Sequence, residues 1–243
     1  MRLASKSDIG KLRDINEDAY LVDGSLFAVA DGMGGHRAGE IASELGLRTF
    51  REAFGPPEPD ASEDAILMAI KKAVDQANTV IHARAAENKE YKGMGTTLTA
   101  AFFARGRLYV AQVGDSRAYL LRAGVIRQLT TDHTLVGEMI AKGEIDEEIA
   151  RIHPLRHVIT RALGTYAAIE SEVYVEELAP GDKILLCSDG LSSKVDNDAI
   201  GRIVNDYKSL IGAINGLVKA ALNAGGEDNI TAVLAEFTEA DFV

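Results

Sequence analysis

The spacing of hydrophobic and polar positions changes several times along the chain, and each change marks a predicted element. Two runs of β-forming residues, 19–22 and 26–30, flank Asp23-Gly24, a dipeptide typical of tight hairpin turns. In the segment 38–50 apolar residues instead recur at helical spacing. We therefore expect a β-hairpin followed by a helix in the N-terminal part of the chain.

A second helix is expected after a proline-rich loop at residues 55–59, which stops the first. Asp60 and Glu63 have the spacing of a capping box. The apolar residues of one helical face follow at Ile66, Ile70, Ala73, Ala77 and Ile81. The two helices would together form a helical layer.

From residue 96 to 129 the pattern changes to a period of two, with turn residues at intervals. These turns are Arg105-Gly106, Gly114-Asp115-Ser116 and Ala123-Gly124. This pattern predicts a meander of consecutive antiparallel strands. The next segment, 132–163, loses the period of two and contains short helical pieces, so we expect an inserted lid there.

Strands are predicted again at 172–176, 184–187 and 230–237. A helix that ends at Gly225-Gly226 is expected before the last of them. Its predicted apolar face consists of Ile211, Ile214, Val218, Ala221 and Leu222.

Runs of strands separated by paired helices, without regular alternation of strand and helix, predict an α+β fold. The expected architecture is two packed, mainly antiparallel β-sheets flanked by pairs of helices, a four-layer α-β-β-α sandwich with a flap insertion. A length of 243 residues suits one large domain. We therefore expect residues 1–243 to form a single domain, with a flap at about 132–163.

Composition and charge narrow the classes of function. The chain has 37 acidic and 26 basic residues, a net charge of −11, which argues against general nucleic-acid binding. Its one cysteine, Cys187, excludes an internal disulfide framework and suits a reducing compartment. No apolar stretch approaches the roughly 20 residues of a membrane span. A cytoplasmic protein without a membrane segment is expected.

Three aspartates, Asp31, Asp115 and Asp189, closely follow apolar runs and stand beside a glycine. Such runs predict buried strands, so each aspartate should lie at the rim of a sheet. Carboxylates that gather in one place need protons, arginines or cations to offset their repulsion. Oxygen ligands without a nearby cysteine or histidine cluster favour hard ions such as Mg²⁺ or Mn²⁺. The sequence therefore favours a metal enzyme.

Six short strings occur in an order that resembles a known family. They are Arg13-Asp14-Ile15-Asn16-Glu17-Asp18, Asp31-Gly32-Met33-Gly34-Gly35-His36, Gly95-Thr96-Thr97, Gly114-Asp115-Ser116-Arg117, Ser188-Asp189-Gly190 and Asp228-Asn229. With these strings the chain resembles bacterial-type members of the protein phosphatase 2C family, the metal-dependent serine/threonine phosphatases. The resemblance covers residues 8–237, nearly the whole chain.

The resemblance implies a set of metal ligands. The aspartate that matches Asp31 bridges two Mn²⁺ or Mg²⁺ ions, and the carbonyl that matches Gly32 helps to hold one of them. The residues that match Asp189 and Asp228 hold the other, and Asp115 with Asp189 would hold a third, weaker ion. Two ions that share a carboxylate can lower the pKa of a bridging water, which would then attack phosphorus in line.

Arg13 and Asp18 are the candidate catalytic residues. A guanidinium group matches two phosphate oxygens and stays charged, so Arg13 is assigned to the substrate phosphate. The alternative is that Arg13 only balances the neighbouring acids. Glu17 and Asp18 match acids that contact the metals directly or through their waters.

The general acid is an open question, because animal members of the family carry a histidine where this chain has Met33. His36 is a candidate substitute, although it could equally cap a helix. A metal-bound water or electrostatic stabilisation of the leaving alkoxide are the other possibilities. Thr160, in the closing part of the flap, is a further candidate site residue. His133 follows Asp132 at the flap entrance, and we expect both to fix a local turn.

The resulting hypothesis is a phosphatase that acts on phosphoserine and phosphothreonine proteins, with a Ser/Thr kinase and its substrates as partners and a monomeric state. The flap would act as a gate for substrate. One alternative is a non-catalytic phosphoprotein-binding regulator on the same fold. Another is a hydrolase for a different phosphate ester.

Overall fold

Two antiparallel sheets form the centre of the computed structural model, which describes residues 1–34, 38–55, 57–58, 61–87 and 89–242. The first sheet has the strand order β1-β11-β10-β7-β8, with bounds Arg2–Asp8, Ile230–Glu236, Lys183–Cys187, Arg117–Arg122 and Val125–Gln128. The second has the order β2-β3-β5-β6-β9, with bounds Asp18–Asp23, Leu26–Met33, Leu98–Ala104, Arg107–Val113 and Glu172–Glu177. The short strand β4, Gly95–Thr96, pairs with β3.

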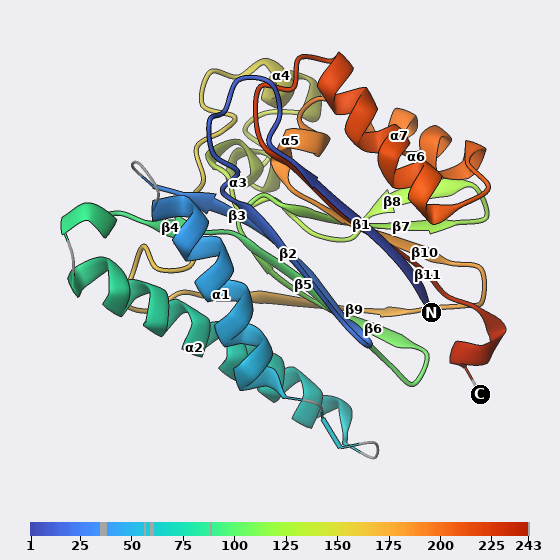
Figure 1. The fold of residues 1–243 in the computed structure, drawn as a ribbon, viewed down its shortest axis with the longest axis horizontal. Coiled ribbons are helices and arrows are strands. Elements are labelled where there is room, and N and C mark those ends of the chain that lie inside the picture. Colours follow the sequence, from blue (N-terminus) through green and yellow to red (C-terminus); the bar gives the residue numbers. More distant parts are fainter. Residues whose placement is uncertain (35–37, 56, 59–60, 88, 243) are drawn as a thin grey trace.

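Helices cover the outer face of each sheet (Figure 1). The helices α1, Ala38–Phe54, and α2, Glu63–Glu87, pack on the second sheet. The helices α6, Asn197–Asp206, and α7, Leu210–Asn223, pack on the first. The predicted four-layer α+β sandwich is therefore confirmed.

Strand β10 illustrates how the alternation of side chains builds these layers. Ile184 and Leu186 are fully buried between the two sheets, whereas Leu185 and Cys187 are fully buried against the helices α6 and α7. Successive side chains of a strand point to opposite faces, so an unbroken apolar run means that both faces are covered. Cys187 is thus a small buried core residue.

The predicted meander was wrong in one respect, because it is divided between the two sheets. Strand β6 pairs with β5 in one sheet and β7 pairs with β8 in the other, and the chain crosses over at Gly114. Gly114 has a φ of +102°, which other residues rarely adopt. A crossing turn and a hairpin turn have similar residues, so the local pattern did not distinguish them.

Other differences arise where a local pattern is weak. Strand β1, helix α6 and the short helix α5, Asp189–Ser192, were not predicted. The predicted capping residue Asp60 lies outside the described residues, and the Ser62 hydroxyl accepts a hydrogen bond from the Ala65 amide at the start of α2 (3.2 Å). Ile211 was placed on the apolar face of its helix, but it is 68% exposed.

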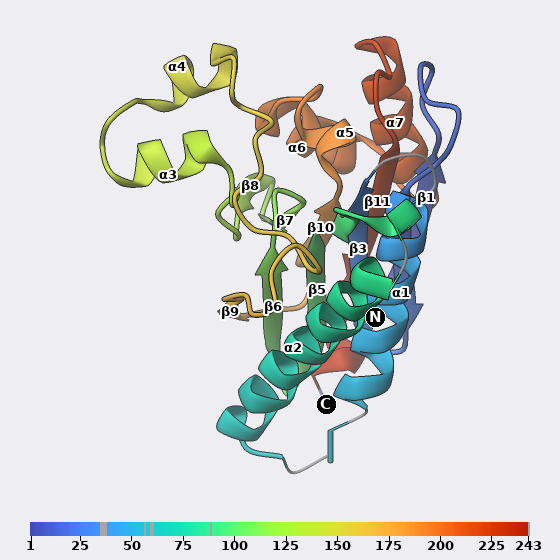
Figure 2. The ribbon, with the colours of Figure 1, turned by 90° about the vertical axis from the view of Figure 1, so that its left-hand side faces the viewer.

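Residues 132–163 carry the helices α3, Leu135–Ala141, and α4, Glu147–Ile152, and these two helices stand apart from the layers (Figure 2). We call this segment the flap. Its roots are close together, since a bridge joins Thr134 to Ile159 and a second joins Leu163 to Thr96 of β4. None of the helices in the described ranges has the length and apolarity required to cross a lipid bilayer.

Two isoleucines with opposite environments test this packing. Replacement of the fully buried Ile184 by alanine should lower the free energy of unfolding by about 2–5 kcal/mol, because it leaves a cavity between the sheets. The same change at the exposed Ile211 should cost less than about 0.5 kcal/mol. Urea denaturation measures both values, and equal losses would contradict the assigned core.

Candidate functional site

The β2–β3 hairpin brings two acids face to face at one end of the second sheet. Asp18, the first residue of β2, is the register partner of Asp31 in β3. The Ser188 hydroxyl donates a hydrogen bond to Asp18 Oδ2 (2.7 Å), while Asp18 Oδ1 is buried without a partner. The Asp31 amide donates to Thr97 Oγ1 (2.9 Å). The backbone of both acids is therefore fixed by pairing, and one carboxylate oxygen of Asp18 remains available.

Two further acids come from neighbouring strands of the first sheet. Asp189 opens helix α5 directly after β10, and Asp228 precedes β11. These strands are antiparallel, so the end of one lies beside the start of the other. Gly190 allows the close contact, because a Cβ atom there would lie 1.9 Å from the carbonyl oxygen of Asn229. Asp189 and Asp228 consequently share one edge.

Asp115 lies in the turn that crosses from one sheet to the other, and it is only 6% exposed. The negative charges that act on Asp31 come from Asp18, Asp115, Asp189 and Asp228. We call these five residues the acid cluster. The structure thus brings together acids from both sheets that the sequence had placed at separate strand ends.

Burial and mutual repulsion raise the pKa values of four aspartates, Asp18, Asp31, Asp115 and Asp189. Burial is the main cause at Asp18, whose pKa rises to about 7, and at Asp115, whose pKa rises to about 8. The pKa values of Asp31 and Asp189 are raised too, by burial and then by the neighbouring aspartates. Without cations, some of these carboxyl groups therefore keep protons near neutral pH.

Glu17 lies beside the cluster, where backbone contacts hold it in place. Its carbonyl oxygen accepts hydrogen bonds from the Gly32 amide (3.1 Å) and the Ser43 hydroxyl (2.6 Å). Its amide donates to Asn229 Oδ1 (2.8 Å). Gly32 is required here, since a Cβ atom would lie 2.0 Å from the carbonyl oxygen of Gly39. These contacts join the second sheet, α1 and the start of β11.

Arg13 lies at the edge of the cluster and is about half exposed. Its Nη2 atom donates to Asp228 Oδ2 over 2.9 Å, and its side chain is 48% exposed. The carboxylate thus keeps the guanidinium group beside the acids, while the rest of the group faces solvent. An arginine in this position can bind an incoming anion without a large rearrangement.

The donor set fits hard divalent cations. Three buried carboxylate oxygens, Glu17 Oε1, Asp18 Oδ1 and Asp115 Oδ1, have no hydrogen-bond partner. Among the described residues, no group of three or more Asp, Glu, His or Cys side chains is arranged so that it could hold a metal ion without other ligands. Mg²⁺ is commonly held by one or two carboxylates, with water in its other positions. The cluster suits that mode of binding.

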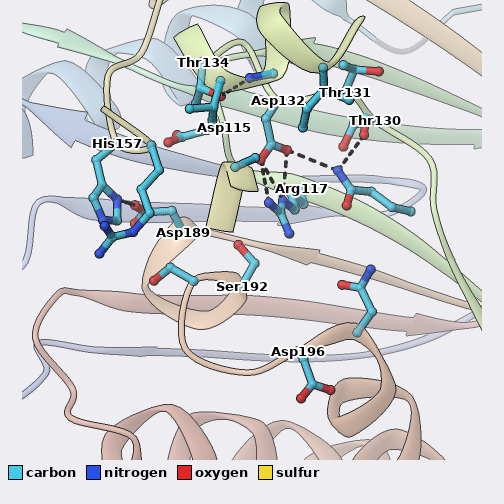
Figure 3. Close-up of a pocket in the computed structure, with 18 of the residues that line it drawn as sticks. Asp115, Arg117, Thr130, Thr131, Asp132, Thr134, His157, Asp189, Ser192 and Asp196 are labelled. Carbon is cyan, nitrogen blue, oxygen red and sulfur yellow. Dashed lines mark hydrogen bonds and ion pairs between the residues drawn. The ribbon is translucent and has the colours of Figure 1, made fainter. Parts of the chain in front are cut away.

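A cleft of about 620 Å³ adjoins the cluster, between the flap and the segment 189–197. Figure 3 shows Asp115 and Asp189 on its wall, with His157 of the flap beside Asp189. The distance from His157 Nδ1 to Asp189 Oδ2 is 3.9 Å. The same cleft contains the salt bridge of Arg117 and Asp132, whose shortest contact is 2.6 Å. An extended substrate in this cleft would reach the acids at one end.

Sequence reasoning located the acids but missed residues that position them. Ser188 and Asn229, which bind Asp18 and Glu17, received no role, although each is a neighbour of a predicted ligand in the sequence. The candidate His36 lies outside the described residues. Thr160 lies at the exit of the flap, where its amide donates to the carbonyl oxygen of His133 (2.8 Å). Its hydroxyl is buried without a partner.

Comparison with known proteins gives one family. A family model described as protein phosphatase 2C matches residues 13–237. The serine/threonine phosphatase stp of Listeria monocytogenes serovar 1/2a is 38% identical over 97% of this chain and 96% of its own length. The serine/threonine protein phosphatase PstP of Mycobacterium tuberculosis is 39% identical over the whole of this chain, which covers 46% of that protein.

Solved structures agree with this result. The M. tuberculosis phosphatase PstP/Ppp superimposes with a TM-score of 0.91 at 39% identity, covering 98% of this chain and 99% of that one. A structure of the PstP catalytic domain in complex with two manganese ions gives a TM-score of 0.87 at 37% identity, with 98% of both chains covered. Stp1 of Staphylococcus aureus gives 0.91 at 32% identity, with 97% of this chain and 94% of that one covered.

The raised pKa values predict how the stability of the metal-free protein depends on pH. A folded-state pKa above the unfolded value means that unfolding releases a proton, so rising pH favours unfolding between the two values. In EDTA, the Tm should therefore fall from about pH 5 to about pH 8, the range below the raised pKa values of Asp18 and Asp115. Asp18→Asn should flatten this decrease and raise the Tm at the upper end.

Asp75→Asn is the matched control, because it removes the same charge from an exposed position of α2. Calorimetric scans at several pH values give the Tm of each protein. Equal slopes for the unmodified protein, Asp18→Asn and Asp75→Asn would show that Asp18 keeps an ordinary pKa.

Proposed function

The chain belongs to the protein phosphatase 2C family of metal-dependent serine/threonine phosphatases, and we propose that Asp31, Asp189 and Asp228 hold the cations of its reaction. The observation that carries this proposal is that aspartates from both sheets lie close enough for their charges to act on Asp31. Like charges so close together repel, and divalent cations offset this repulsion. The carbonyl oxygen of Gly32 is proposed as a further ligand.

The ions are proposed to be Mn²⁺ or Mg²⁺, with two bound tightly. The carboxylate and carbonyl donors suit either ion. The solved relative with two manganese ions supports this stoichiometry. A third, weaker ion would be held by Asp115 and Asp189, since the negative charge of Asp189 acts on Asp115. When bound, such cations lower the pKa of water and so provide a nucleophile near neutral pH.

Arg13 is proposed to bind the substrate phosphate. Its guanidinium group has several N–H donors, and its hydrogen bond to Asp228 uses the Nη2 nitrogen. A phosphate group at the cluster would take up the remaining donors and could replace Asp228 as the partner of Arg13. Asp228 would then be available for a cation. The alternative, that Arg13 only balances the acids, predicts no direct effect on substrate binding.

Asp18 and Glu17 are proposed to orient water. Asp18 Oδ2 already accepts a hydrogen bond from Ser188, so Oδ1 is the atom that can accept one from water in the cluster. Glu17 Oε1 is buried and free of partners in the same way. A carboxylate that accepts the hydrogen bond of a water both orients it and increases its basicity. This gives Asp18 a catalytic role and Glu17 a supporting one.

Protonation of the leaving alcohol does not depend on Met33, because a thioether has no proton to donate. Water in the cleft or electrostatic stabilisation of the alkoxide can meet this need. A serine or threonine alkoxide next to cations and Arg13 is partly neutralised, which lowers the demand for a dedicated acid.

The cleft beside the flap is proposed as the path of the phosphoprotein chain. It has the cationic residues Arg156 and Lys194 and the apolar residues Val136 and Ile140 on its walls, and it ends at Asp189. An extended peptide could therefore place its phosphorylated residue at the acid cluster and its flanking residues along the flap. Residues 132–163 would act as a flap of one catalytic domain, because strands from both ends of the chain share the two sheets.

The cellular setting follows from the family and remains a proposal. A Ser/Thr kinase and its substrates would be the partners, since a phosphatase of this class reverses kinase action. The cytoplasm is the proposed compartment, because the single cysteine is buried and unpaired in the described structure. The protein is proposed to act as a monomer.

Metal dependence is tested by hydrolysis of a phosphothreonine peptide with EDTA, Mg²⁺ or Mn²⁺. Activity should require a cation. Asp31→Asn and Asp189→Asn should each lower kcat/KM by more than roughly 100-fold. Loss of a residue that only orients a metal ligand typically costs roughly 10- to 100-fold, and loss of a ligand itself should cost more. Asp23→Asn is the matched control, because Asp23 lies at the far end of β2 and forms an exposed pair with Arg51 of α1 (2.6 Å). Release of inorganic phosphate is the measurement.

Two other results of this experiment would change the assignment. Tight binding of the phosphopeptide without turnover in every metal would favour a phosphoprotein-binding regulator. Faster hydrolysis of small phosphate esters than of the peptide would favour a different substrate.

The role of Arg13 is tested by its replacement with alanine and with lysine. Arg13→Ala should lower kcat/KM for the phosphopeptide by about 10- to 100-fold, the effect of losing one or two charged hydrogen bonds. Arg13→Lys should recover only part of this loss, since an ammonium group cannot bind two oxygens as a fork. Arg51→Ala, which removes another exposed arginine that pairs with an aspartate, should leave kcat/KM unchanged.

Inhibition by inorganic phosphate separates the two interpretations of Arg13. The inhibition constant should rise in parallel with the loss of activity if Arg13 binds phosphate directly. An unchanged inhibition constant would support the charge-balancing alternative.

A further inference from the structure

His133 is a buried histidine at the entrance of the flap, and no step of the reaction uses it. It is only 3% exposed. Its backbone bonds tie two segments together: the His133 amide donates to the carbonyl oxygen of Gly114 (2.9 Å), and its own carbonyl oxygen accepts from the Thr160 amide (2.8 Å). The entrance and exit of the flap thus meet at His133, beside the turn that carries Asp115.

The imidazole ring reinforces this connection. Nδ1 accepts a hydrogen bond from the Gly114 amide (3.1 Å). Nε2 lies 3.2 Å from Glu172 Oε1, at the start of β9. Only a neutral ring with its proton on Nε2 satisfies both contacts, because Nδ1 must accept while Nε2 donates. Burial lowers the pKa of His133, which keeps the ring in this neutral form.

Arg161 completes the surroundings of the ring. Its Nη1 atom lies 3.5 Å from His133 Nε2 and 3.3 Å from Glu172 Oε1. Two donors do not bind each other, so the partner of Arg161 is Glu172. The Glu172 carboxylate therefore holds His133 of the flap entrance and Arg161 of the flap exit at the same time.

The turn held by His133 has little freedom on its other side. Gly114 has a φ of +102°, and a Cβ atom at this position would lie 2.5 Å from the Thr97 methyl group. Thr97 Oγ1 in turn lies 2.8 Å from Ser116 Oγ. The Gly114–Asp115 turn is consequently enclosed between Thr97 and His133. A shift of the imidazole ring would remove Nδ1 as the acceptor of the Gly114 amide.

We propose that His133 is a positioning residue that fixes the turn of Asp115 through its Nδ1–Gly114 hydrogen bond and so couples this carboxylate to the root of the flap. The proposal deepens the proposed function, because Asp115 is there a ligand of the weaker cation. Movement of the flap entrance would change the place of Asp115. In the part of the chain that the structure describes, the hydrogen bonds of His133 go to Gly114, Thr160 and Glu172, and not to the segments that carry Asp31 and Asp228.

Two substitutions test the contacts of the two ring nitrogens separately. In His133→Asn, the amide oxygen can take the place of Nδ1 and accept from Gly114, while the contact with Glu172 is lost. In His133→Gln, the amide lies near the position of Nε2 and can donate to Glu172, while the Gly114 amide loses its acceptor. Both variants remove an aromatic ring from the same buried position, so each is a control for the packing change in the other.

The first readout needs no metal and no activity. Amide hydrogen exchange of residues 113–116 in EDTA should be faster in His133→Gln than in the unmodified protein, and close to normal in His133→Asn. The second readout is Mn²⁺ binding by calorimetry. The affinity for the weaker ion should fall about 10-fold or more in His133→Gln, the usual effect of losing a partner that orients a ligand. Affinity for the tight ions should stay unchanged in both variants.

Equal exchange rates in all three proteins would overturn the proposal, because the Nδ1–Gly114 hydrogen bond would then not hold the turn. Equally faster exchange in both variants would also overturn it, because loss of the packed ring alone would then explain the change. Absence of a weak binding step in the unmodified protein would instead contradict the ligand role of Asp115, and amide exchange would still decide the role of His133. If the variants do not fold, ¹⁵N imidazole spectra of the unmodified protein decide it. A proton on Nδ1 would rule out the proposed bond.

Discussion

Repulsion among buried carboxylates is the constraint on which the rest of this structure depends. Two charges about 4 Å apart repel by about 4 kcal/mol at an effective dielectric constant of about 20, and five aspartates act on one another here. Burial adds a cost for each ionised group, as the raised pKa values of Asp18 and Asp115 indicate. Bound cations or substrate would offset this unfavourable free energy, so the cluster is explained by function and not by stability.

The sandwich supplies the rigidity that this arrangement needs. Asp31 and Asp189 lie near the ends of β3 and β10, two strands whose apolar residues are buried on both faces. Close backbone contacts at Gly32 and Gly190 leave no space for a side chain, which fixes β3 against α1 and α5 against the start of β11. Antiparallel pairing of β10 with β11 then sets Asp189 beside Asp228. The apolar core therefore determines the spacing of the charged groups.

The flap differs from this core in both packing and exposure. Several of its apolar side chains, among them Ile152 and Leu155, are exposed, while its root is held by a polar network around His133 and Glu172. A segment with a fixed root and a loosely packed outer part can change its contacts with substrate without disturbing the sheets. This segment meets the acid cluster at the turn of Asp115 and again where His157 lies beside Asp189.

The sequence by itself determined most element types, the layered architecture and three of the acids, Asp31, Asp115 and Asp189, because these depend on local periodicity and on turn residues beside apolar runs. The roles of Asp18 and Asp228 came from the family resemblance. The sequence did not determine that the chain changes sheets at Gly114, since the residues of a crossing turn also suit a hairpin. Strand β1 gave no local apolar pattern, and its place depends on pairing with β11, more than 220 residues away in the chain. The contacts of Ser188, Asn229 and His133 likewise join segments that are distant in sequence. Only tertiary structure could place them, because burial, pairing and repulsion between such segments exist only after the two sheets have packed.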